Sequence, residues 1–177
     1  MSQFMELALR RQSCRSFSDK PISHETLVQI VEAARLAPSG CNAQPWSFVV
    51  AESPEAVAAV AKAGQQLGAN AFLEKAQAFI IVLEEHAVLM PGIRKFLDSQ
   101  YFAKGDMGAA AVSVCYAAAD LGVGTCHIGL FDREQLGQIL DIPAEKQYGI
   151  LIAVGYPADD KIRTKIRKDA AETVRFV

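Results

Sequence analysis

The spacing of apolar and polar residues changes several times along the chain between a helical period and a strand period. Residues 26–36 place apolar side chains on one helical face, after Ser23 as an N-cap and before Pro38. The apolar run 78–83 is instead typical of a strand covered on both faces. The same reasoning predicts further elements: helices at 4–11, 55–63, 100–121 and 133–140, and strands at 46–50, 125–130 and 148–154.

Helices and strands alternate without an internal repeat, a low-complexity stretch or a linker, which predicts one α+β or mixed α/β domain over residues 1–177. An apolar content of 51% in 177 residues is enough to bury a substantial core. The end of the chain differs in character. Five of the eight residues in 161–168 are basic, and 174–177 is mostly apolar. We expect this tail to pack on another surface, because it carries too little apolar material to fold by itself.

Charge and composition argue against several classes of protein. The formal net charge is −2, so neither nucleic acid nor an anionic membrane is expected as the main partner. No uncharged stretch, 107–119 included, reaches the roughly 20 residues of a membrane-spanning helix. Four scattered cysteines and a charged N-terminus favour a cytoplasmic protein. The cysteines and histidines lack metal-ligand spacing, so no metal is expected, and Cys14 and Cys126 are interpreted as packing residues.

Two basic clusters stand at opposite ends of the chain, Arg10/Arg11/Arg15 and residues 161–168. They are either two solvated surfaces or one composite phosphate site, in which Ser13 adds a hydroxyl to the arginine donors. A P-loop is absent, and residues 122–127 lack the third glycine of a dinucleotide-binding turn. These absences disfavour a nucleotide kinase and a Rossmann fold, and the phosphate-bearing ligands that remain include FMN held by scattered side chains.

Four short motifs follow one another along the chain: Arg11-x-Ser13-x-Arg15 with Phe17, Pro38-Ser39-x-x-Asn42-x-Gln44-Pro45-Trp46, Gly124-Thr125-Cys126-His127-Ile128-Gly129, and Lys165-x-Arg167. Together they resemble the motifs of the nitroreductase family of FMN-dependent reductases, in the same order and over nearly the whole chain. The resemblance implies an α+β three-layer sandwich, with a mixed central sheet flanked by helices. It also implies an intertwined homodimer with FMN at the subunit interface.

The resemblance also implies a set of cofactor-binding residues: Arg11, Gln12, Ser13, Arg15, Pro38, Ser39, Asn42, Gln44, Asn70, Ile128, Gly129, Lys165 and Arg167. Of these, Arg11, Ser13, Lys165 and Arg167 would hold the phosphate. Arg15 would approach the N1/C2=O edge of the flavin, where its positive charge would raise the electron affinity of the ring. Loop residues Ser39 and Asn42 would come from the partner subunit, and the backbone around Gly129 would face N5.

These motifs lead to an expected function, with alternatives. The main hypothesis is an enzyme that moves a hydride from NADH or NADPH to N5 of FMN and then reduces a small acceptor, such as a nitroaromatic or a quinone. The alternatives are an FMN-binding carrier, sensor or electron-transfer protein without NAD(P)H turnover, and a specialised chemistry such as reductive dehalogenation. His127 is either a proton donor or hydrogen-bonded packing. Trp46 is expected in the core, and Asp106 as a cap of the long helix.

Overall fold

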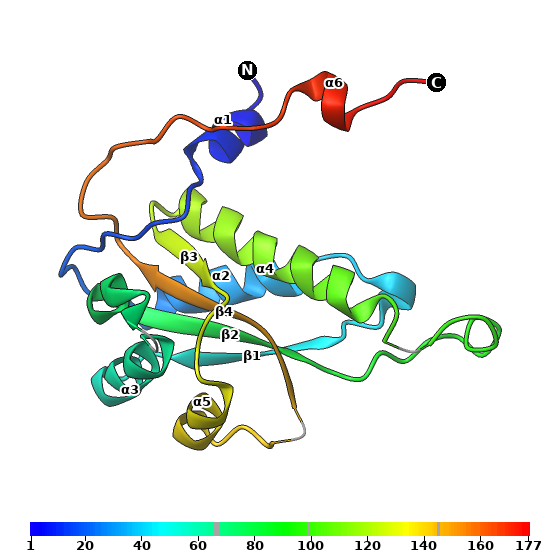
Figure 1. The fold of residues 1–177 in the computed structure, drawn as a ribbon, viewed down its shortest axis with the longest axis horizontal. Coiled ribbons are helices and arrows are strands. Elements are labelled where there is room, and N and C mark those ends of the chain that lie inside the picture. Colours follow the sequence, from blue (N-terminus) through cyan, green and yellow to red (C-terminus); the bar gives the residue numbers. More distant parts are fainter. Residues whose placement is uncertain (66–67, 99, 145) are drawn as a thin grey trace.

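The computed structural model describes residues 1–65, 68–98, 100–144 and 146–177, and places helices on both faces of a four-stranded sheet (Figure 1). The strand order is β1-β2-β4-β3, with bounds β1 Trp46–Ala51, β2 Ala78–Glu84, β3 Gly124–Ile128 and β4 Gln147–Gly155. The expected α+β three-layer fold is confirmed.

One detail of the sheet differs from the expectation. All three strand pairs are antiparallel, whereas a mixed sheet was expected. Among the described residues, the parallel pairing is limited to an isolated bridge between Ser13 and Thr125. The N-terminal segment touches β3 there without forming a strand of its own.

The helices are α1 (Gln3–Arg10), α2 (His24–Arg35), α3 (Pro54–Gly64), α4 (Ala103–Asp120), α5 (Arg133–Leu140) and the short α6 (Ala170–Thr173). Several of their ends coincide with signals that the sequence carries. The Ser23 and Ser53 side chains accept hydrogen bonds from the backbone N–H groups of Thr26 and Ala56. Gly122, just after α4, has a φ of 73°, the left-handed conformation that glycine adopts most easily. Local capping chemistry therefore sets these boundaries.

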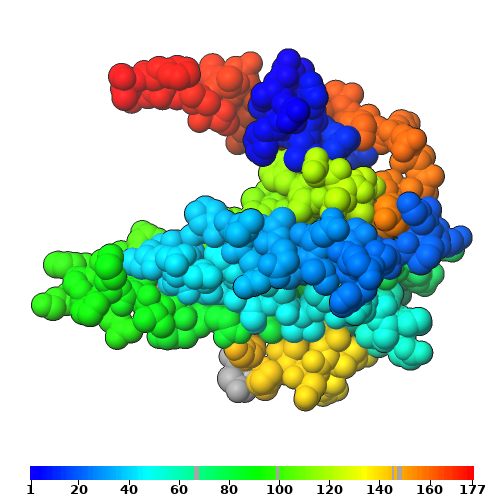
Figure 2. All heavy atoms as spheres, turned by 180° about the vertical axis from the view of Figure 1, so that it is seen from behind, coloured from blue at the N-terminus to red at the C-terminus, as the bar shows by residue number. Residues whose placement is uncertain are grey.

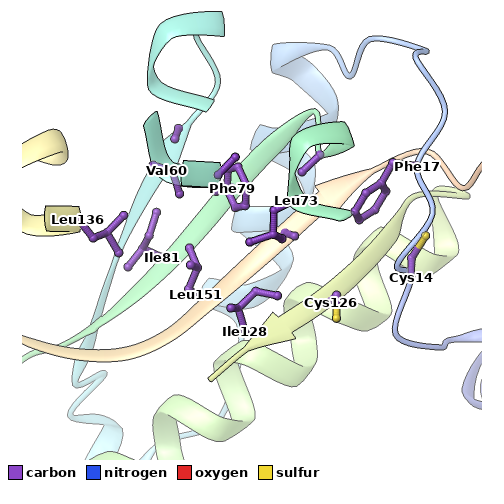
Figure 3. Close-up of a cluster of buried hydrophobic side chains, with 14 of the residues drawn as sticks. Cys14, Phe17, Val60, Leu73, Phe79, Ile81, Cys126, Ile128, Leu136 and Leu151 are labelled. Carbon is purple, nitrogen blue, oxygen red and sulfur yellow. The ribbon is translucent and has the colours of Figure 1, made fainter. Parts of the chain in front are cut away.

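Two apolar clusters lie on opposite faces of the sheet because successive strand residues point to opposite sides. In β2, Phe79 and Ile81 join one cluster with α3 and α5, which Figure 3 shows, while Ile80 and Val82 join the other with α2 and α4. All four side chains are fully buried, which confirms the expectation for this strand. Trp46 at the start of β1 is buried too, as expected.

The C-terminal arm, residues 158–177, leaves the sheet after an antiparallel bridge between Phe17 and Pro157. It runs past α1 and ends in the short α6, so that both chain termini lie on the same side of the molecule (Figure 1). Figure 2 shows the arm standing away from the body, with a hollow between them. Several apolar side chains of α1 and the arm are exposed: Phe4, Met5, Leu9, Ile166, Val174 and Phe176. None of the described helices is both long and apolar enough to cross a membrane.

Candidate functional site

The fold brings the two basic ends of the chain together. Arg11, Gln12 and Ser13 line one cavity of about 380 Å³ with residues 163–167 of the arm. The ammonium group of Lys165 donates a hydrogen bond to the carbonyl oxygen of Arg11. Five of the predicted cofactor-binding residues therefore share one cavity, although their two groups are separated by about 150 positions in sequence. The two basic clusters therefore form one combined surface in the fold and not two separate ones.

This cavity concentrates positive charge. Arg11, Arg163, Lys165 and Arg167 line it, and none of the described residues in its lining is acidic. The pKa of Lys165 is lowered, first because burial disfavours the charged ammonium and then because the three arginines repel it. A bound anion would relieve both effects.

Arg11 supplies the sharpest indication of what the cavity accepts. Its Nε atom is buried, and no described residue gives it a hydrogen-bond partner. Leaving a buried charged donor unpaired costs more than an ordinary missing hydrogen bond, on the order of 1–3 kcal/mol or above. A phosphate group offers several acceptor oxygens and negative charge at once, so the residues present fit the phosphate end of FMN.

The N-terminal segment continues from this cavity along β3. The backbone N–H of Cys14 donates to the carbonyl oxygen of Thr125 at 2.8 Å, next to the bridge at Ser13. Arg15 lies in a second cavity of about 230 Å³. There the guanidinium group of Arg15 partly offsets the effect of burial, which raises the pKa of the Cys126 thiol. Arg11 and Arg15 thus line different cavities, although they lie on one segment. Contact with the phosphate and contact with the flavin ring, the roles expected of them, need such a separation.

The end of β3 presents an open backbone. The strand stops at Ile128, two residues earlier than predicted, so Gly129 and Leu130 lie in an exposed loop. A Cβ atom added to Gly129 would meet nothing within 4 Å, and its backbone does not have a positive φ. The fold itself would therefore accept a side chain here. Glycine instead keeps this face clear for close approach by another molecule.

Asn70 supports the same loop. Its backbone is left-handed, with a φ of 58°. Its side-chain amide donates to the carbonyl oxygens of Gly64 and Leu130, at 3.0 and 3.2 Å. The two amide hydrogens are thus used to hold the loop beside Gly129, which leaves only the amide oxygen of Asn70 for a direct cofactor contact.

The loop of residues 38–44 is conformationally strained. Cys41, Asn42 and Gln44 all have positive φ values, of 54°, 52° and 47°. Each such residue costs on the order of 1–3 kcal/mol and persists only where its surroundings enforce it, often at functional sites. The backbone N–H of Gln44 donates to Ser39 Oγ at 2.9 Å, which helps to fix the loop.

Asp106 is the other anchor of this loop, and here the expectation was wrong. We expected Asp106 to cap the long helix, but α4 has Phe102 at its N-cap, without a side-chain cap. The Asp106 carboxylate instead accepts a hydrogen bond from the backbone N–H of Gly40 at 3.0 Å. Asp106 lies four residues after the N-cap, where its backbone N–H donates to the carbonyl oxygen of Phe102 and its carboxylate reaches a loop that is distant in sequence.

Helix α4 separates this loop from the basic cavity. Asp106 holds the loop near the start of the helix, while Arg10 donates to the carbonyl oxygen of Ala119 at the other end, at 3.0 Å. The rise of an α-helix puts positions 106 and 119 about 20 Å apart along its axis. One chain therefore does not bring four of the predicted residues to the cavity around Arg11: Pro38, Ser39, Asn42 and Gln44.

His127 is an exposed residue of β3, but its ring packs against α4. The Nε2 atom lies 3.2 Å from the Sγ atom of Cys115. Burial of the ring lowers the pKa of His127, and the charge of Arg11 adds to this effect, while the backbone of Ala111 opposes it. A neutral ring held by α4 favours packing over proton donation.

Arg163 is the residue that sequence reasoning missed. It lies within the basic run 161–168, but the family motif pointed only to Lys165 and Arg167. In an extended chain, residues two apart point to the same side, so positions 163, 165 and 167 share one face. That spacing could have identified Arg163.

Comparison with known proteins identifies the family of this chain. The model of the nitroreductase family matches residues 8–156, and the chain belongs to this family. It is 31% identical over 165 residues to an Archaeoglobus fulgidus protein provisionally named NADH dehydrogenase/NAD(P)H nitroreductase, covering 91% of this chain and 89% of that protein. It is 27% identical to FMN reductase [NAD(P)H] of Bacillus subtilis, covering 90% and 68% of the two chains.

A solved structure shares the fold closely. A provisionally named nitroreductase of Exiguobacterium sibiricum, crystallised in complex with FMN, superposes with a TM-score of 0.85. The match covers 100% of this chain and 98% of that one at 23% sequence identity. The likeness shows that the two proteins have the same fold.

The titration midpoints of His24 and His127 should be displaced from the ordinary histidine pKa in opposite directions. Hydrogen bonding to Glu52 raises the pKa of His24, whereas burial lowers that of His127. A lowered pKa favours folding while the ring is neutral, so the contribution of His127 to stability should be lost as the pH falls below about 6.5, the unfolded value. NMR titration of the imidazole signals checks both shifts, and a His127→Gln variant assigns them. Equal midpoints would contradict this account.

Proposed function

We propose that this protein binds FMN, with the phosphate held by Arg11, Ser13, Lys165 and Arg167, and catalyses NAD(P)H-dependent reduction of a small acceptor. The buried, unpaired Nε of Arg11 within a cluster of cations is the observation that carries the proposal. The names of the relatives, NAD(P)H nitroreductase and FMN reductase, support the same chemistry. When bound, FMN supplies hydride transfer, from NADH or NADPH to an acceptor such as a nitroaromatic or a quinone.

The remaining residues orient this chemistry. Arg15 lines the second cavity, beside Cys126 of β3, where a fixed guanidinium would stabilise negative charge on the pyrimidine edge of the ring. Gly129 would leave room beside N5 of the flavin for a nicotinamide or an acceptor. Asn70 would act mainly by holding the loop at Leu130 in place.

A complete site would need two copies of the chain. The strained loop 38–44 is separated from its own Arg11 by the length of α4, so a second copy would supply it. Exposed apolar side chains on α1 and at residues 174–177 would be buried in such a homodimer. The extended arm has the form expected of a segment that wraps around a partner.

Reduction by NAD(P)H tests the function directly. Protein mixed with FMN should bind it, and anaerobic addition of NADH or NADPH should bleach the visible absorbance of the bound flavin. A Gly129→Ala variant should slow this bleaching about 10- to 100-fold, because a methyl group displaces the nicotinamide. Gly92→Ala, at a similarly open glycine, is the control. Bound FMN that stays oxidised would support a carrier or sensor instead, and no FMN binding at all would sink the proposal.

Arg11 and Arg15 should have separable roles. Arg11→Ala should weaken FMN binding by about 1.5–3 kcal/mol, the value of a charge-assisted hydrogen bond. Arg15→Ala should also lower the reduction potential of the bound flavin, because a positive charge near the ring is lost. Titration calorimetry and redox titration measure the two effects. Arg35→Ala, in an exposed pair with Glu32, is the control. Equal loss of FMN affinity in both variants, with an unchanged reduction potential of the bound flavin, would contradict the separate roles of Arg11 and Arg15.

Mixed dimers test the two-chain site. Arg11→Ala and Asn42→Ala homodimers should each bind FMN poorly. In a heterodimer of the two variants, one site carries both substitutions and the other carries neither, so about half of the normal FMN content should return. Co-expression with two purification tags and flavin quantification measures this recovery. A heterodimer that recovers no FMN would show that both residues act within one chain, and an Asn42→Ala homodimer with normal FMN content would show that Asn42 has no role.

A further inference from the structure

Two side chains, Gln12 and Arg163, join the C-terminal arm to the N-terminal segment. The amide nitrogen of Gln12 donates to the carbonyl oxygen of Lys161 at 2.7 Å. Its Oε1 atom accepts hydrogen bonds from both the backbone N–H and the Nε of Arg163, at 3.1 and 3.2 Å. The Arg163 guanidinium also donates to the carbonyl oxygen of Ser13. The amide of Gln12, expected to bind the cofactor, is therefore occupied by the arm.

These contacts bring like charges together. The arm cannot dock in this way without placing Arg163, Lys165 and Arg167 in the cavity with Arg11. Repulsion among these cations opposes docking, most strongly between Arg11 and Lys165, which are partly buried, because charges interact more strongly away from bulk water. The hydrogen bonds of Gln12 favour docking. An anion in the cavity would shift this balance strongly toward the docked arm.

We propose that residues 158–168 form a phosphate-dependent latch, in which Gln12 and Arg163 dock the arm and the phosphate of the cofactor closes it. The latch rests on the proposed function, because it takes FMN as the ligand. Arg163 is a positioning residue in this scheme: it acts through Gln12 and Ser13 and so sets where Lys165 and Arg167 lie. The same arm carries the apolar end 174–177, so phosphate binding would also favour the contact of this end with a second copy.

Hydrogen exchange of the full-length protein tests the latch. Saturating FMN should slow amide exchange in residues 158–168 about tenfold, while riboflavin, which lacks the phosphate, should change it by less than about twofold. Inorganic phosphate at millimolar concentration is an FMN-independent probe and should slow the same segment. Flavin fluorescence quenching reports binding separately. Failure of FMN to bind, with protection by phosphate, would refute the proposed function but support the latch. Equal protection by FMN and riboflavin, or no protection by either FMN or phosphate, would overturn the latch.

A double-mutant cycle tests the role given to Gln12 and Arg163. Gln12→Ala and Arg163→Ala should each reduce FMN affinity about tenfold and leave riboflavin affinity within about twofold. The double variant should be little worse than the worse single variant, because both substitutions break the same contact. Lys168→Ala removes an equal charge from the arm at an exposed position outside the cavity and should have a smaller effect. Equal losses in Arg163→Ala and Lys168→Ala, or strictly additive losses in the double variant, would overturn the assignment.

Discussion

Mutual repulsion of the cations around Arg11 is the constraint on which the site depends. Four positive side chains meet where the two ends of the chain cross, and the Arg11 Nε has no partner among the described residues. Such an arrangement is stable only when hydrogen bonds hold the crossing segments and an anion compensates the charge. Gln12 provides the first condition, and a phosphate would provide the second. The position of the arm and the fit to FMN follow from this one balance, and the repulsion adds to burial in lowering the pKa of Lys165.

The sheet and α4 determine how far this site can extend. The N-terminal segment is fixed beside β3 by the contact between Ser13 and Thr125, so the basic cavity lies at one end of α4. Asp106 fixes the strained loop 38–44 at the other end. A rigid helix cannot shorten to bring the two together. The length of this helix is therefore the physical basis of the proposed site shared between two copies of the chain.

Much of the fold could be predicted because its signals are local. Ser23 and Ser53 cap their helices, Gly122 ends the long one, and the run 78–83 is buried on both faces as its pattern predicts. The candidate site was predicted through its motifs, and five of those residues share the cavity around Arg11. Gln12 received a direct cofactor role because a hydrogen bond across 151 positions leaves no periodic trace in the sequence. The two-residue spacing of positions 163, 165 and 167 could have identified Arg163.

The sequence by itself determined the order of helices and strands, the apolar faces that they bury and the chemical types of the site residues. Only the tertiary structure decided which of those residues meet. In the folded chain Asp106 binds the loop at Gly40 and does not cap a helix, and His127 contacts Cys115. The side chain of Gln12 binds the C-terminal arm. The physical reason is range: capping and periodicity act within a few residues, whereas these contacts depend on how whole layers and chain ends pack.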